Sequence, residues 1–176
     1  PNPGTNFGRS GQPPPAYLAA NGGSLPSSQG CSGTCPAGNS ANDSVNLRVE
    51  IRVPTNAQSL AFQFRFASSE YPTYVCDLYN DFFLALLDTN AAGIPADRNI
   101  SFDSFANPVS VNNGFLEVCQ PTGCYTCPYG VSELAGTGMD NNNGAGTVWQ
   151  QTVAPVVPGE TITLEFMIFD VSDNIG

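Results

Sequence analysis

The stretch that most constrains the fold is VNLRVEIRV, residues 45–53, in which apolar and polar residues alternate without a break. A period of two places every apolar side chain on one face of an extended strand, whereas an amphipathic helix requires a period of 3.6. The apolar face comprises Val45, Leu47, Val49, Ile51 and Val53. The segment therefore predicts a half-buried β-strand.

Other segments carry strand signals of two kinds. LAFQFRF, residues 60–66, alternates in the same way, with its leucine and phenylalanines inward, whereas FFLALL, residues 82–87, is continuously apolar. A continuous apolar run is typical of a strand covered on both faces. Longer strands are expected at 147–153, with Trp149 in the core, and at 161–169, and a turn at Pro158-Gly159 should connect them.

Shorter strand candidates lie at 99–102, 109–111 and 114–118, and no segment has a convincing helical period. Several short strands separated by turn signals predict an all-β fold, an antiparallel β-sandwich or jelly roll. Residues 1–44 are rich in glycine, proline and serine and predict an irregular arm, and residues 45–176 form the sandwich domain. The sequence ends where a further strand is expected to begin, so the sandwich lacks its last strand in this chain or receives it from another segment, as in donor-strand pairing.

The charge balance excludes several classes of partner. Fifteen acidic residues face five basic ones, which gives a net charge of −10. Nucleic acids and anionic membranes require a positive surface, so neither is an expected partner, whereas divalent cations are. The longest apolar run is far too short to span a bilayer. Few charged residues and abundant Ser, Thr, Asn, Gln and Gly are typical of exported all-β proteins.

Six cysteines occur without any histidine: Cys31, Cys35, Cys76, Cys119, Cys124 and Cys127. Six cysteines allow fifteen disulfide pairings, and sequence alone does not choose among them. A zinc site in the Cys119–Cys127 region is the alternative, although it would need a fourth thiolate at an irregular spacing. We expect disulfides, with Cys76 joined to the Cys119–Cys127 region, and hence an oxidising, extracellular location.

Carboxylates follow or precede the predicted core strands. Glu70 follows the 60–66 strand, Asp81 opens the 82–87 strand, and Asp170 and Asp173 follow the last strand. If these strands are neighbours, the four acids gather at one end of the sandwich, where Ca²⁺ would find the six to eight oxygen ligands that it needs. The remaining oxygens would come from Asn80, Asn112 and Asn113, while Asp77 is expected on the surface. The alternative is that these acids only occupy loop ends and never meet.

Catalysis is the weaker interpretation of the same residues. Glu70 and Asp81 could form the acid–base pair of a glycosidase. The chain has no histidine, which excludes Ser–His and Cys–His nucleophiles. Five tyrosines near these segments could stack on sugars, but packing against the core is more common. They are Tyr71, Tyr74, Tyr79, Tyr125 and Tyr129. We therefore do not expect an enzyme.

The order of these motifs resembles a known family. The segments LAFQFRFASSEYPTYVCDLYNDFFLALLD, NISFD, PVSVNN and GTVWQQTVAPVVPGETITLEFMIFDVSD are similar to the choice-of-anchor L domain of bacterial exported proteins, over roughly residues 45–176. The resemblance implies an extracellular or surface-attached module, and in that family the pattern continues into one more strand, DS-x-V-L-x-D. The predicted architecture is also similar to CUB domains, which bind Ca²⁺ through Glu and Asp at one end.

Together these features predict an extracellular structural or adhesive module of a bacterial surface protein, fibre or matrix, stabilised by Ca²⁺ and disulfides. The expected partners are other surface or matrix proteins or copies of the same chain, with glycans as a further possibility. The alternative is a Ca²⁺-dependent carbohydrate-binding module.

Overall fold

A computed structural model describes residues 12–31, 33–38, 40–103, 106–112, 116–140 and 143–172, and all structural statements below concern these residues. The elements in chain order are α1 (Pro15–Ala20), β1 (Ser28–Gly30), β2 (Gly33–Cys35), β3 (Ala41–Arg52), β4 (Ser59–Phe64), β5 (Ala67–Ser68), β6 (Phe82–Asp88), β7 (Val109–Ser110), the 3₁₀ helix η1 (Ser132–Leu134), β8 (Ala145–Gly146), β9 (Gln150–Pro155) and β10 (Thr161–Val171). All strand pairs are antiparallel, which confirms the all-β sandwich.

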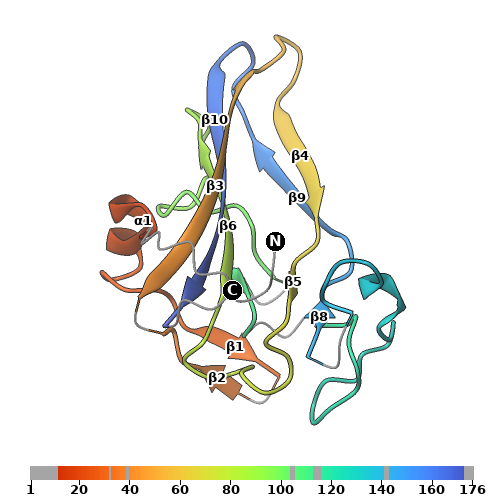
Figure 1. Ribbon diagram of the computed structural model, residues 1–176. Coiled ribbons are helices and arrows are strands. Elements are labelled where there is room, and N and C mark those ends of the chain that lie inside the picture. The colour runs from red at the N-terminus through yellow and green to blue at the C-terminus, as the bar shows by residue number, and fades with distance from the viewer. Residues whose placement is uncertain are drawn as a thin grey trace.

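The first layer is a four-stranded sheet in the order β3-β10-β6-β7. Its inner strands are the most apolar of the chain, and β6 is buried from Phe82 to Leu87 apart from a partly exposed Phe83. A strand buried on both faces needs a covering layer on each side. The N-terminal segment with α1 lies on one side of the sheet and β4 with β9 on the other (Figure 1).

The N-terminal segment contributes side chains to the core. Tyr17 and Leu25 are 1% and 6% exposed and pack with Leu84, Leu86 and Phe169 of the first sheet. The sandwich strand β3 begins at Ala41, four residues before the alternating stretch. The short helix α1 lacks the periodicity that predicts helices because it has only six residues.

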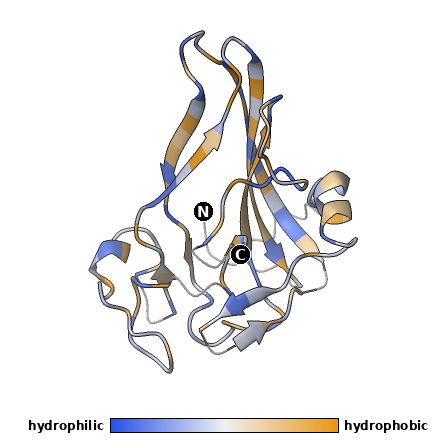
Figure 2. Ribbon diagram, turned by 180° about the vertical axis from the view of Figure 1, so that it is seen from behind, coloured by the Kyte–Doolittle hydropathy of each residue, from blue (hydrophilic) through white to orange (hydrophobic). Residues whose placement is uncertain are grey.

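The second layer is a two-stranded ribbon. β4 pairs with β9, and the same two chain segments pair again as β5 with β8. Apolar and polar residues alternate along these strands (Figure 2). Leu60 and Phe62 of β4 pack on the core residues Leu87, Ile162 and Leu164 of the first sheet. The alternation of residues 60–66 therefore faces the core as predicted.

The expectation that Trp149 belongs to the core is wrong, because its side chain is 63% exposed. Phe64 pairs with Gln150 and Ala67 with Gly146, so two residues on one strand face three, 147–149, on the other. Such a bulge interrupts the alternation of a strand and redirects its side chains. The Arg65 guanidinium lies over the Trp149 ring, 5.9 Å from its centroid.

The inner face of the first sheet is only partly covered. Val53 is 3% exposed, whereas Val45 and Leu47 on the same face of β3 are 65% and 60% exposed. Ile168, paired with Val45, is 43% exposed. The β4–β9 ribbon packs against the end that contains Val53, and Phe64 and Phe66 continue the cover over Phe83, so the side chains left exposed are those on the β3 side of the sheet.

The predicted turn at Pro158-Gly159 is present, but β9 and β10 belong to different sheets, so the turn connects the two layers. Glu160 holds this corner together. Its carboxylate accepts hydrogen bonds from the Thr89 hydroxyl, from the Asn90 backbone at 2.9 Å and from the Val157 backbone at 2.7 Å. The bond from Thr89, followed by those from Asn90 and Val157, lowers the pKa of Glu160 to about 2.

The shorter predicted strands are present only as isolated β-bridges or as a two-residue strand. Asn99 and Phe102 form isolated bridges, and β7 covers Val109–Ser110. In the 114–118 candidate, Val118 forms a bridge with Gly146, while residues 114 and 115 lie outside the described residues. No helix in the described parts of the chain is long and apolar enough to cross a membrane.

All six cysteines form disulfides, which confirms that prediction over the zinc alternative. The pairs are Cys31–Cys124, Cys35–Cys76 and Cys119–Cys127. The expected link from Cys76 to the Cys119–Cys127 region is wrong. Within that region Cys119 pairs with Cys127, and Cys124 pairs with Cys31 of the N-terminal segment. Cys76 pairs instead with Cys35 of β2.

Candidate cation site

Asp81 and Asp170 each lie one position beyond the last residue pair that joins the two central strands β6 and β10. Phe82 of β6 pairs with Phe169 of β10 in an antiparallel register, so the next position outward places Asp81 opposite Asp170. On its other side Asp170 pairs with Asn42 of β3. That these strand-end acids meet stays a prediction, which the register of the last paired residues makes possible for Asp81 and Asp170.

Of the other two predicted acids, the structure describes Glu70 but not Asp173. Glu70 follows β5 and begins the turn that leads to Cys76, where its carbonyl accepts the Tyr74 N–H at 3.0 Å. One carboxylate oxygen of Glu70 and one of Asp81 are buried. Asp173 and Asn113 lie outside the described residues. Buried carboxylate oxygens favour a cation or hydrogen-bond donors beside them, because desolvation penalises an isolated charge.

Asn80 and Asn112 are both fully buried and form a hydrogen-bonded pair. The Asn80 side-chain oxygen accepts the Asn112 N–H at 3.0 Å, and the Asn112 side-chain oxygen accepts the Cys76 N–H. The Asn112 amide group donates to the carbonyls of Pro36 and Asp77 at 3.3 and 3.1 Å. These contacts tie the loop before β6 to the segment after β7.

The Asn80 and Asn112 pair thus has a structural role that the sequence did not reveal. Both side-chain oxygens already accept backbone N–H groups, so either would act as a cation ligand only through its second lone pair. The Cys35–Cys76 disulfide anchors the same loop to β2. Asp77 is exposed, as predicted, and its carboxylate accepts the N–H of Leu78 at 2.7 Å.

The chemistry available at this end is that of hard oxygen donors. Asp81 and Asp170 supply two carboxylates on rigid neighbouring strands, and Asn42 lies next to them. Among the described residues no three acidic or cysteine side chains gather closely enough to hold a metal ion. Calcium at this site stays a prediction, and its ligand set depends on Asp173 as well as on Glu70.

The tyrosines divide into a packed and an exposed set. Tyr71 is 1% exposed, donates its hydroxyl hydrogen bond to the Gln120 carbonyl and packs edge-on against Tyr125 at 5.5 Å. Burial raises the pKa of Tyr71, and burial followed by the neighbouring Tyr71 raises that of Tyr125 to about 12. Tyr74 and Tyr129 are 46% and 54% exposed. Packing therefore explains Tyr71 and Tyr125, as predicted.

The sequence profile of the choice-of-anchor L domain matches residues 32–175. The match includes every described strand from β2 onward, whereas α1 and β1 lie before it. No curated protein and no solved structure is significantly similar to the chain.

Proposed function

The chain belongs to the choice-of-anchor L family, whose domains are modules of bacterial surface proteins, and from this premise we propose that it is an exported, non-enzymatic structural or adhesive module stabilised by Ca²⁺ and disulfides. The observation that supports the calcium proposal is the pairing of Phe82 with Phe169, since Asp81 and Asp170 are the next residues outward on the two strands. Two neighbouring carboxylates repel each other, and a cation bound between them would turn this repulsion into attraction. A bound ion would fasten the ends of β6 and β10 together.

Calcium removal tests this proposal. We expect the melting temperature of the protein to fall when EGTA replaces millimolar CaCl₂, because an ion that binds only the folded state stabilises it by about 2.7 kcal/mol at 100 times its Kd. Asp81→Asn should lower the melting temperature in CaCl₂ and abolish the response to EGTA. Differential scanning calorimetry measures both effects.

Asp77→Asn is the matched control, because Asp77 lies in the same loop, is exposed, and its carboxylate accepts the N–H of the adjacent Leu78. This variant should respond to EGTA as the unchanged protein does. A melting temperature that is the same in CaCl₂ and EGTA would contradict the proposal. So would an Asp81→Asn variant that still loses stability on chelation.

The edge strands of the second layer are suited to pairing with another copy of the chain. β4 and β9 contain no charged residue, whereas β3, the edge strand of the first sheet, carries Arg48, Glu50 and Arg52. Charged side chains on edge strands oppose pairing with other chains, and uncharged edges permit it. Trp149 and Val153, each 63% exposed, provide apolar surface beside β9. We infer that a second copy of this chain adds its β9 to β9, which would extend the ribbon into a continuous sheet.

Sedimentation velocity tests this pairing with two matched valines. Val153 of β9 and Val45 of β3 are 63% and 65% exposed, so lysine should be tolerated at both positions. We expect Val153→Lys to shift the protein toward the monomer and Val45→Lys to leave its association unchanged, since a lysine on the pairing strand opposes strand addition. A protein that is monomeric at all concentrations, or that responds equally to both changes, would rule out the β9 interface.

A further inference from the structure

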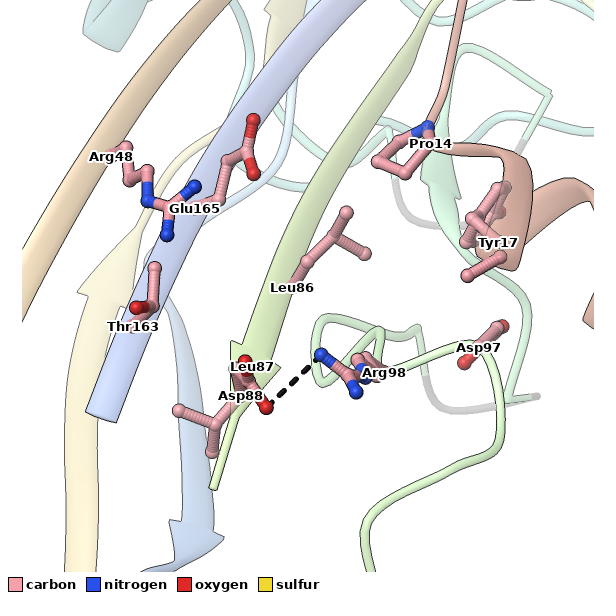
Figure 3. Close-up of a pocket in the computed structure, with 11 residues that line it drawn as sticks. Pro14, Tyr17, Arg48, Leu86, Leu87, Asp88, Asp97, Arg98, Thr163 and Glu165 are labelled. Carbon is pink, nitrogen blue, oxygen red and sulfur yellow. Dashed lines mark ion pairs between the residues drawn. The ribbon is translucent and has the colours of Figure 1, made fainter. Parts of the chain in front are cut away.

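A hollow of about 160 Å³ lies between the N-terminal segment and the outer face of the first sheet, and we call it the arm pocket. Pro14 and Tyr17 form one side, while Arg48, Thr163 and Glu165 of β3 and β10 form the other (Figure 3). The apolar side chain of Leu86 lies between these two sides (Figure 3). The pocket is at the opposite end of β6 from Asp81, so it is distinct from the candidate cation site.

The arm pocket gathers charges of both signs. Its lining contains two of the five basic residues of the chain, Arg48 and Arg98, and three carboxylates, those of Asp88, Asp97 and Glu165. Arg98 forms an ion pair with Asp88 at 3.0 Å (Figure 3). The charges of these five side chains nearly cancel. The carboxylates would repel a strongly anionic ligand, and the guanidinium groups would repel a strongly cationic one.

The carboxylates are held in place by neighbouring donors. Asp97 accepts the Asn99 N–H at 3.0 Å and the Asn21 side-chain amide at 3.3 Å. Glu165 accepts the Asn46 side-chain amide at 2.7 Å. Each carboxylate oxygen has a second lone pair to offer, so Asp97 and Glu165 remain able to accept a hydrogen bond from a ligand.

Two donors at or near the pocket are not engaged by the described residues. Arg48 forms no ion pair with a described carboxylate, and the Tyr17 hydroxyl is buried without a hydrogen-bond partner among the described residues. Burial, followed by the nearby Asp97 charge, raises the pKa of Tyr17, so the hydroxyl keeps its proton and stays a donor. A buried polar group without a partner is costly, and in native proteins it often indicates a site for water or ligand.

We propose that the arm pocket binds one neutral sugar ring. A sugar hydroxyl both donates and accepts, so a set of them pairs with the carboxylates and with Arg48 at once. The apolar face of the ring, which presents its C–H groups, would pack on Leu86 and Pro14. The volume is smaller than the roughly 300–1,000 Å³ of pockets for larger ligands, which limits the occupant to a single ring or the end of a chain.

This inference goes beyond the proposed function and does not require calcium, so its test is done in EGTA. Methyl α-glucoside, methyl α-galactoside and N-acetylglucosamine are titrated into ¹⁵N-labelled protein, with glucuronic acid and glucosamine as charged comparators. At least one neutral sugar should bind with a roughly millimolar Kd. It should shift the backbone amide signals of Leu86, Arg98 and Thr163, and it should bind more tightly than the charged sugars.

Arg48 and Arg52 provide a matched pair, because they lie four residues apart on the same face of the exposed edge strand β3 and only Arg48 lines the pocket. Arg48→Ala should weaken binding about tenfold or more, while Arg52→Ala should leave it within about twofold. The proposal is overturned if no neutral sugar binds or if a charged sugar binds better. It is also overturned if both variants weaken binding equally, or if the shifted signals surround Asp81 instead. None of these outcomes bears on the melting response to calcium.

Discussion

Leu84→Ala is expected to lower the free energy of unfolding by about 2–5 kcal/mol, while Leu47→Ala should change it by no more than about 0.5 kcal/mol. Leu84 is 0% exposed on the central strand β6 and packs in the cluster that includes Tyr17 of the N-terminal segment. Its truncation would leave a cavity between the first sheet and the N-terminal segment. Leu47 is 60% exposed, so its truncation removes little buried contact.

Urea denaturation followed by tryptophan fluorescence or circular dichroism measures both variants. The slope of the transition should stay unchanged if the variants alter stability rather than the compactness of either state. Equal destabilisation by the two changes would show that another segment covers Leu47 in the folded protein. A loss below about 1 kcal/mol for Leu84→Ala would contradict the packing of the N-terminal segment on the sheet.

This pair of leucines also shows what the sequence can predict. The alternation over residues 45–53 correctly places Leu47 and Val53 on one face of a strand, because the period of two is a property of the strand itself. How much of that face is covered depends on where the second layer lies. The β4–β9 ribbon packs over Val53 and not over Leu47, and no local pattern encodes that difference.

The candidate cation site was partly predictable for the same reason. Strand ends are visible in the sequence, so Asp81 and Asp170 could be assigned to them, but whether the two residues approach each other depends on the pairing of β6 with β10. The roles of Asn80 and Asn112 were not predictable, because asparagine at a strand end is equally typical of an exposed turn. Their burial arises from loops that are 32 residues apart in the chain.

The N-terminal segment was the least predictable part. Its composition predicts an irregular arm, whereas Tyr17 and Leu25 dock it against the sheet. The arm pocket exists only because of this docking, since Pro14 and Tyr17 form one of its sides. No motif in the sequence predicts the arm pocket, because its two sides come from segments that are far apart in the chain.

Removal of the Cys31–Cys124 disulfide by Cys31→Ala/Cys124→Ala should lower the free energy of unfolding by about 4.6 kcal/mol on the loop-entropy model. This bond joins residues 93 apart, and both cysteines are exposed, so the double change leaves no cavity. Cys119→Ala/Cys127→Ala opens a loop of only eight residues, for which the same model gives about 2.5 kcal/mol.

Calorimetry of the two double variants therefore separates chain entropy from packing. Cys119 and Cys127 are 0% and 4% exposed beside Tyr71, so a larger loss for this pair would show that local packing exceeds loop closure. A loss below about 1 kcal/mol for the Cys31–Cys124 pair would show that the N-terminal segment and the Cys119–Cys127 region remain joined without the bond. If the expected loss is found, the folded state depends strongly on oxidation, as suits a protein that functions outside the reducing cytoplasm.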